Sequence, residues 1–377
     1  MILPPLPQRG QAFYIAIEIP RKRGFEMLRG VLIIEGFCLL CIVLCTCMPV
    51  IALPSGFCLG EDGAIVLGVF IPHASPAGEE QVIKEELQSF MDTIGHHPAI
   101  GVFSDEWATD RKFPLQSVDS LRKDGIIPYI RLMLRSSDRP YQSEPLYTLH
   151  NIAQGKFDSE LRAWAREARS VGSPILIEYG TEVNTWNYPW NGYWNGYQKA
   201  HDAFRDAYRH IIAIMREEGA SNLIWIYHVN AESQPDEEWN IITSYYPGDE
   251  YCDLVALSIF GTTKPFESRR EPFNSSLNAA IHDIKAGGIN KPILLITGTD
   301  VHNQYEDPAI FVSTLLSSLA QGTWPDIRGL IWVNAAWKND NNPLHDTTMK
   351  LEDNASVSAA YKAGLKPLMI QERLACS

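Results

Sequence analysis

The sequence predicts a (β/α)8 barrel in a single domain, and three observations support this fold class. From Ala64 onward, short β-branched runs alternate with longer amphipathic stretches, as in successive βα units of a parallel sheet. Eight such runs occur, which is the number of strands in a closed barrel. The first run leads into Pro72-His73-Ala74-Ser75-Pro76, which lacks the glycines of a phosphate-binding turn. A doubly wound open sheet is therefore the second choice.

Each expected strand is almost continuously hydrophobic, as strands covered on both faces are. The expected strands are Ile65–Ile71, Ala99–Phe103, Ile126–Met133, Pro174–Glu182, Leu223–Val229, Asp253–Gly261, Pro292–Thr297 and Gly329–Val333. Helices are expected between them, because apolar residues recur there at spacings of three and four. The clearest are Glu79–Ile94, Asp158–Ser170, Tyr197–Glu218, Leu277–Ala286 and Pro308–Ala320.

Composition limits the partners. The chain has 45 acidic and 32 basic residues, a net charge of −13, and no basic stripe interleaved with aromatic residues. Nucleic acid is therefore not an expected partner. The sequence contains no His-x-x-x-His pattern and no EF-hand loop, so we expect neither a metal nor a cofactor. The loop Asn339–Asn342 is interpreted as a solvated turn in preference to a weak calcium site. We expect a monomer.

Residues 1–58 are expected to form a signal peptide or signal anchor with a short linker, and residues 59–377 the barrel. The run Gly36–Leu53 is uncharged and follows a basic stretch, as in export signals. Met27 is an alternative start to Met1. We therefore expect an exported protein, extracellular or periplasmic, in which residues 31–53 would serve as the membrane anchor if they are not cleaved. Four of the seven cysteines lie in this apolar run, so no disulfide framework is predicted.

The loops after the C-terminal ends of barrel strands form the active site in this fold. Acids, imidazoles and indoles follow the predicted strand ends here, as a sugar cleft requires, although loop caps and core packing explain any single one of them equally well. These residues are His73, Asp105, Glu106, Trp107, Glu182, Trp186, Trp190, His228, Asn230, Asp300, His302, Trp332 and Trp337. His96 and His97 precede the second strand, so we expect them at the opposite rim in structural roles.

Glu182 stands out among the acids. It ends the fourth predicted strand within Glu178–Gly192, a segment rich in aromatic residues. A general acid at a glycosidic oxygen needs a partly desolvated pocket, and neighbouring indoles supply one. Glu178 would share the inward strand face with Glu182 but lie deeper in the barrel, where Arg131 on strand three is its expected structural partner.

The run Glu182-Val183-Asn184-Thr185-Trp186 resembles the acid/base motif of glycoside hydrolase family 26, the family of many β-mannanases. In that motif a strand-four Glu is followed by Met or Val, then Asn, Gly and a Trp. The runs Trp225–Asn230 and Tyr246–Asp253 and the strand spacing extend the resemblance from about Ala64 to Trp337.

The resemblance implies hydrolysis of O-glycosyl bonds in a β-linked polysaccharide, of the β-mannan or mixed β-glucan type. Glu182 would protonate the leaving oxygen, and a second Glu at the end of strand seven would attack the anomeric carbon from about 5 Å away. Substrate contacts are expected from His73, Trp107, Asn184, Trp186, Trp190, Trp194, His228, Phe260, His302, Trp332 and Trp337.

The sequence departs from this pattern at the second carboxylate. The expected Glu falls at Thr297 or Ile296, and neither is an acid. The Tyr that would hydrogen-bond it corresponds to Phe260, and the His before the acid/base corresponds to Thr181. Asp300 is the nearest candidate second acid. An extended chain would place it roughly 10 Å beyond the expected position, which is too far for direct attack unless the loop folds back, and at that separation it could instead activate a water and give inversion.

Two functions therefore remain open. The first is a glycoside hydrolase with Glu182 and Asp300 as the catalytic residues. The second is a catalytically inactive barrel that binds carbohydrate. A barrel acting on phosphorylated substrates is disfavoured because no Gly-rich phosphate loop follows strands seven or eight.

Overall fold

The computed structural model describes residues 57, 59–60, 63–70, 79–263 and 271–374. All of them belong to the second of the two units into which the chain divides, Val50–Ser377. Of the predicted leader, residues 1–58, only Phe57 is among the described residues. The predicted substrate contact His73 also lies outside the described residues. Among the described residues, no helix is long and apolar enough to cross a membrane.

Eight parallel strands close into a barrel, as the sequence predicts. They are β1 (Ile65–Phe70), β2 (Ile100–Glu106), β3 (Ile127–Met133), β4 (Ile175–Tyr179), β5 (Leu223–Asn230), β6 (Leu254–Ser258), β7 (Ile293–Thr297) and β8 (Ile327–Val333). Each strand pairs with the next in the sequence, and β1 also pairs with β8, which closes the ring. Short β11 (Ile370–Gln371) pairs with β1. After β8, strands β9 (Ala336–Trp337) and β10 (Thr347–Thr348) form an antiparallel pair.

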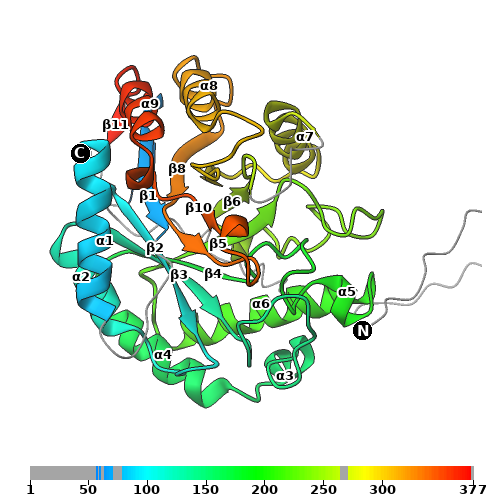
Figure 1. Cartoon of the computed structure of the whole chain (residues 1–377). Coiled ribbons are helices and arrows are strands. Elements are labelled where there is room, and N and C mark those ends of the chain that lie inside the picture. The colour runs from blue at the N-terminus through cyan, green and yellow to red at the C-terminus, as the bar shows by residue number, and fades with distance from the viewer. Residues whose placement is uncertain (1–56, 58, 61–62, 71–78, 264–270, 375–377) are drawn as a thin grey trace, which may run out of the picture. The chain divides into compact units, whose positions relative to one another are not determined.

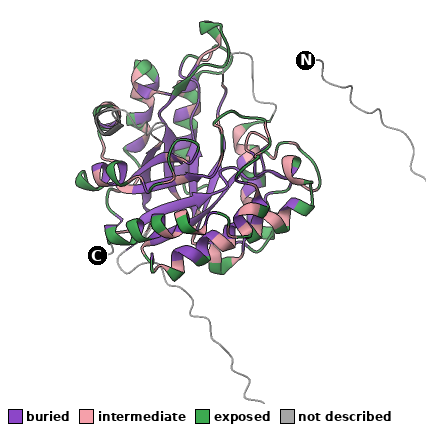
Figure 2. Ribbon diagram, turned by 90° about the horizontal axis from the view of Figure 1, so that it is seen from below, coloured by how far each residue is buried: buried purple, intermediate pink, exposed green. Residues whose placement is uncertain are grey.

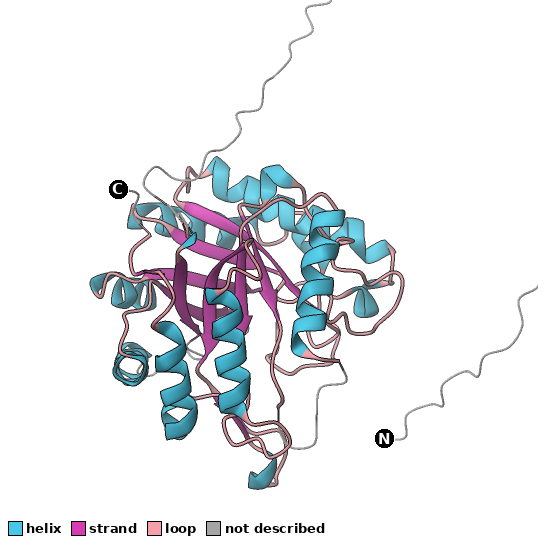
Figure 3. Cartoon of the chain, turned by 90° about the horizontal axis from the view of Figure 1, so that it is seen from above, coloured by secondary structure: helices cyan, strands magenta, loops and turns pink. Residues whose placement is uncertain are grey.

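Helices surround the barrel (Figure 1, Figure 3). They are α1 (Glu79–Ile94), α2 (Leu115–Lys123), α3 (Leu149–Ala153), α4 (Asp158–Val171), α5 (Gly192–Asn195), α6 (Lys199–Glu217), α7 (Phe273–Ala286), α8 (Pro308–Ala320) and α9 (Ala355–Leu365). Three-residue 3-10 helices occur at Asp249–Tyr251, Pro343–His345 and Leu351–Asp353. The predicted helices therefore form within a few residues of their expected ends.

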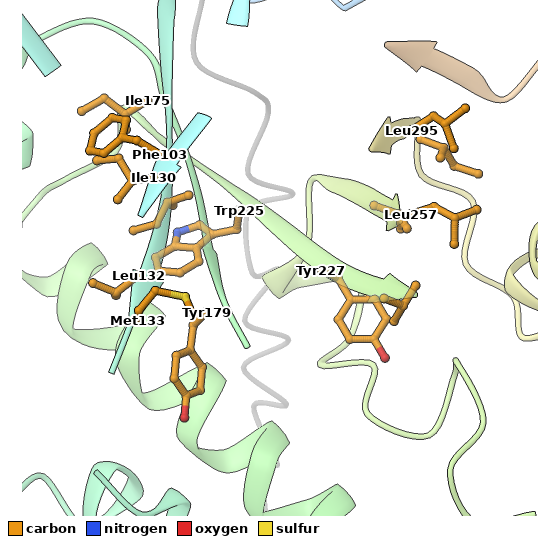
Figure 4. Packing of buried hydrophobic residues seen from close by; sticks show 14 of the residues in the cluster. Phe103, Ile130, Leu132, Met133, Ile175, Tyr179, Trp225, Tyr227, Leu257 and Leu295 are labelled. Carbon is orange, nitrogen blue, oxygen red and sulfur yellow. The ribbon is translucent and has the colours of Figure 1, made fainter. Parts of the chain in front are cut away.

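The strands are covered on both faces, which explains their continuous hydrophobicity. Alternate residues point to opposite faces of a strand, so on β7 Leu294 and Ile296 belong to the cluster inside the barrel. Ile293 and Leu295 belong to the larger cluster between the strands and the helices. Figure 4 shows Leu295 with other members of the outer cluster, and Figure 2 shows buried strands inside helices whose outer faces are exposed.

Strand four ends earlier than the sequence predicts. It stops at Tyr179, so Glu182 lies in the following loop and not on the strand. The cause is Gly180, whose φ of +83° breaks the extended conformation. A Cβ at this glycine would lie 2.4 Å from Cε2 of Phe204, so only glycine allows the chain to turn against α6 at this point.

Candidate active site

Glu182 lies in the loop after β4 with a constrained backbone. Its φ is +44°, a value that residues other than glycine rarely adopt. The conformation is held because the carbonyl of Glu182 accepts hydrogen bonds from Thr185 N at 2.8 Å and from Thr185 Oγ1 at 3.1 Å. The next residue, Val183, donates its N–H to the carbonyl of His228 at 3.2 Å. The backbone around Glu182 is therefore held to β5, and the residue is 8% exposed.

Arg131 and Tyr188 are the charged and polar neighbours of Glu182. Arg131 Nη2 donates to Tyr188 Oη at 2.8 Å. Burial alone would lower the pKa of Arg131, but Tyr188, Glu178 and Glu182 together raise it above its usual value, so the guanidinium remains charged. Burial raises the pKa of Tyr188 above its usual value. The positive charge of Arg131 opposes this increase in pKa, and the negative charge of Glu182 adds to it. Glu182 thus lies within electrostatic range of a permanent positive charge and a neutral phenol.

Glu178 is fully buried inside the barrel and is the centre of a hydrogen-bond network. The hydroxyls of Tyr129 and Thr181 donate to its two carboxylate oxygens. Arg131 Nε lies 3.5 Å from Oε1, which confirms the pair predicted from the sequence. His228 Nδ1 lies 2.7 Å from Oε2. We call Tyr129, Arg131, Glu178, Thr181, His228 and Ser258 the Glu178 network.

Strand seven carries an aliphatic residue where the second carboxylate was sought. Ile296 belongs to the inner cluster and faces the barrel interior, 6% exposed. Thr297 points the other way, since its register partner is Trp332 of the outer cluster. Of the two positions left open by the sequence, only Ile296 therefore faces the site. Half-buried Phe260 packs against the same inner cluster.

Asp300 has the environment of a structural carboxylate. It is fully buried, and its oxygens accept from the backbone N–H of His302 at 2.8 Å and of Thr348 at 3.1 Å. Its own N–H donates to the carbonyl of Thr262 at 2.9 Å. These bonds connect the loop after β7 to β10. A carboxylate with no exposed area cannot contact a substrate without rearrangement, so this geometry favours a structural role over the expected catalytic one.

Three of the indoles predicted to contact the substrate are buried and do not present a face to a ligand. Trp332 is fully buried in the outer cluster, and its Nε1 donates to the carbonyl of Met349. Trp107 is 2% exposed in the same cluster. Trp190 is also 2% exposed, and its ring stacks on Tyr188 with centroids 5.1 Å apart. Indoles are as well suited to core packing as to sugar binding, and the sequence does not separate the two.

The remaining predicted contacts fall into two groups. Asn184 is fully buried and holds the loop to β5, because Nδ2 donates to the carbonyl of Asn230 and Oδ1 accepts from its N–H, both at 2.8 Å. His228 belongs to the Glu178 network. The side chains with accessible surface are His302, Trp337 at 40% exposure, and half-buried Trp186 and Trp194. The ring of Trp186 contacts Tyr141 and Tyr193 edge to face.

Sequence reasoning missed several polar residues of this region. Arg135, after β3, was not singled out, and two of its nitrogens bind Glu106, which was expected at this rim, at 2.8 and 2.5 Å. Ser258 ends β6, and strand alternation from Leu254 would have predicted its inward orientation. Tyr188 gives no local signal, since its contact with Arg131 depends on the loop conformation. Among the described residues, no group of three or more His, Cys, Asp or Glu is placed to hold a metal ion.

Comparison with known proteins shows a family similarity in the middle of the chain. The model of glycosyl hydrolase family 26 matches residues 155–291, which include Glu182 and end just before β7. Endoglucanase H of Acetivibrio thermocellus is 26% identical over 220 residues, which are 57% of this chain. The chain spans 23% of the length of that protein.

Solved structures share the barrel at low identity. The Bacillus subtilis mannanase BCman aligns with a TM-score of 0.55 and 17% identity, over 83% of this chain and 88% of its own. A double mutant of the Cellulomonas fimi endo-beta-1,4-mannanase aligns with a TM-score of 0.59 and 13% identity, over 83% of this chain and 72% of its own. These likenesses show the fold, and the family match confirms the resemblance seen in the sequence. The chain is thus similar to glycosyl hydrolase family 26 over residues 155–291.

Proposed function

We propose that this chain hydrolyses O-glycosyl bonds of a β-linked polysaccharide, of the β-mannan or mixed β-glucan type, with Glu182 as the acid/base. The match to glycosyl hydrolase family 26 supports the reaction class, and the names of the similar proteins, endoglucanase and mannanase, support the substrate class. The observation that carries the proposal is the fixed position of Glu182 after β4, beside Arg131 and Tyr188. Loops after barrel strands are where catalytic residues of this fold occur.

In this mechanism a protonated Glu182 gives its proton to the glycosidic oxygen as the bond to the anomeric carbon breaks. The resulting carboxylate is stabilised by the positive charge of Arg131. No glycosyl ester can form at Ile296, because that side chain has no carboxylate. The anomeric carbon is therefore attacked by water, and the base that accepts the water proton has to come from elsewhere in the site. Asp300 is the base proposed from the sequence, and its burial counts against it.

A second function is a barrel that binds the glycan without cleaving it. Two observations favour it: Ile296 faces the interior where a nucleophile was expected, and Phe260 lacks the hydroxyl that would orient one. The backbone of Glu182 favours hydrolysis, because its φ of +44° is a rarely populated conformation. Such strained residues occur mainly at functional sites.

Replacing Glu182 by Gln separates the two functions. The wild type should release reducing ends from β-mannan or mixed-linkage β-glucan, and Glu182→Gln should lower that rate by about 10²- to 10⁴-fold, because a positioned acid contributes that much. Calorimetric binding to a manno-oligosaccharide should be retained in the variant. Binding without hydrolysis by the wild type would establish the second function, and unchanged hydrolysis by Glu182→Gln would remove this residue from the mechanism.

The Asp300→Asn variant tests the proposed base. Asn can still accept a hydrogen bond through Oδ1 but cannot take a proton, so activity that persists in this variant excludes Asp300 as the base. Export through residues 31–53 and a monomeric state are also proposals. Cell fractionation and light scattering test them.

A further inference from the structure

Three side chains of the Glu178 network form a linear array inside the barrel. Ser258 Oγ lies 2.6 Å from His228 Nε2, and His228 Nδ1 lies 2.7 Å from Glu178 Oε2. The serine comes from the end of β6, the histidine from β5 and the glutamate from β4. Each contact is within the range of a direct hydrogen bond. Neither the proposed acid/base nor the missing carboxylate of strand seven accounts for this arrangement.

The surroundings of Glu178 determine where the protons lie. Tyr129 and Thr181 both donate to its carboxylate, and Arg131 adds a positive charge. Burial alone would raise the pKa of Glu178, but the interactions with His228, Arg131 and Thr181 lower it, so the carboxylate is ionised. An ionised carboxylate can only accept, so His228 Nδ1 must carry a hydrogen. In the neutral imidazole, Nε2 is then free to accept the hydroxyl proton of Ser258.

We propose that Ser258 is a nucleophile activated by His228, with Glu178 holding the imidazole in the required tautomer, and that the chain cleaves small acyl esters carried by glycan hydroxyls. A hydroxyl, an imidazole base and a carboxylate that orients the base are the parts of an acyl-transfer triad, which is recognised by geometry on any fold. Serine, histidine and glutamate occur here in that order and at triad distances.

The reaction proceeds in two balanced steps. Ser258 Oγ attacks the ester carbonyl carbon, its proton passes to His228 Nε2, and the bond from carbonyl carbon to sugar oxygen breaks. The sugar oxygen leaves with the proton from Nε2, and the acyl group stays on Ser258. Water then attacks the acyl carbon and gives its proton to His228. The carboxylic acid leaves, and Ser258 recovers its proton.

The sheet register places a hydrogen-bond donor beside the nucleophile. Asn230 is the register partner of Ser258 on β5 and is half-buried. Its Oδ1 accepts from Glu232 N at 2.9 Å, which leaves the Nδ2 group available to donate. Side-chain amides are among the groups that stabilise the oxyanion of acyl transfer. Asn230 is therefore the candidate oxyanion donor.

Burial limits the size of the ester. Ser258 is 1% exposed, and Phe260 follows it two positions later on the inward face of the chain. At this depth the side chains around Ser258, Phe260 among them, have to move before the ester carbon and the sugar oxygen bonded to it can reach the hydroxyl, which favours an acyl group as small as acetyl. We take the alcohol part of the ester to be a glycan hydroxyl. This part of the proposal rests on the proposed function, because the same barrel would bind the polysaccharide that carries the ester.

The test uses the full chain and a sugar-free probe, 4-nitrophenyl acetate. We expect saturable hydrolysis that falls at least ~10³-fold in Ser258→Ala and in His228→Gln. Ser117→Ala is the matched control, since Ser117 is also 1% exposed but lies on α2, and its rate should equal that of the wild type. A small fluorophosphonate should label the wild type at Ser258, as located by peptide mass spectrometry. This label decides the matter even if a variant fails to fold.

An unlabelled Ser258 in folded wild-type protein, or ester hydrolysis that persists in Ser258→Ala, would overturn the proposal and reduce the three side chains to a stabilising network. Acetate release from acetylated mannan tests the glycan part separately. Labelling of Ser258 without such release would overturn the substrate class. Because the aryl ester contains no sugar, failure of glycan hydrolysis leaves this result unchanged, so the two proposals fail independently.

Discussion

Restoring a carboxylate at strand seven tests how the site is assembled. Ile296 faces the barrel interior, and Phe260 packs against the same cluster. We predict that the double variant Ile296→Glu, Phe260→Tyr gains a covalent route, in which Glu at position 296 attacks the anomeric carbon while Glu182 protonates the leaving oxygen. This route requires the two carboxyl groups to lie about 5 to 5.5 Å apart.

The structure gives the expected stability change. Ile296 is 6% exposed, so replacing it forfeits much of the ~1.5–3 kcal/mol that a buried aliphatic side chain contributes. An unpartnered charge at this depth adds to the loss, and the single variant should be about 3–5 kcal/mol less stable than wild type. A phenol at position 260 that donates to the new carboxylate should recover about 1.5–3 kcal/mol. The double variant should therefore be more stable than the single one.

The assay combines turnover with trapping. Reducing-end release from β-mannan should rise by at least about 10²-fold over the double variant with Gln at position 296, which has nearly the same shape but no nucleophile. A 2-fluoro mannoside with a good leaving group should leave a sugar attached to residue 296, detected by mass spectrometry. If the folded Glu variant traps no sugar and turns over no faster than its Gln control, then Glu182 and position 296 do not face a common bond.

Three further predictions concern stability. Burial raises the pKa of Asp105 to about 8 from an ordinary value of 3.8, so folding favours its neutral form and stability should fall as the pH rises from about 4 to 8. Asp105→Asn, which can still accept from Trp164 Nε1, should flatten the dependence of Tm on pH over this window, and an unchanged slope would contradict that pKa. Gly180→Ala should cost about 2–4 kcal/mol in urea denaturation because of its φ of +83° and the contact with Phe204, so a loss below about 0.5 kcal/mol would show that the loop relaxes freely. Thr297→Val should raise stability by about 1 kcal/mol in the same assay, because it removes a buried hydroxyl that has no hydrogen-bond partner among the described residues; a decrease would indicate that a partner exists.

The barrel could be predicted from the sequence because its signals are local and repeated. Each strand is buried on both faces and so appears as a hydrophobic run, and each run is followed by a helix with apolar spacing. Strand ends were less predictable. Gly180 ends β4 through a left-handed turn that depends on Phe204 of α6, which is distant in the sequence. Glu182 is consequently displaced from the strand on which the sequence placed it.

The site could be predicted only in part. The Arg131–Glu178 pair followed from strand alternation and the cost of burying a charge. The burial of Trp332 and Asp300 did not follow, because indoles and acids near strand ends have the same local pattern whether they face the mouth or the helices. The contact of His228 with both Glu178 and Ser258 depends on the stagger between strands, which no local pattern encodes.

The central claim is that Glu182 acts on a glycosidic bond at the barrel mouth. Crystals of Glu182→Gln soaked with a β-1,4-linked manno-oligosaccharide test it most directly, because the variant should bind the sugar without cleaving it. We predict a glycosidic oxygen within about 2.6–3.2 Å of the side chain at position 182. An oligosaccharide bound elsewhere, with residue 182 touching no glycosidic oxygen, would contradict the claim.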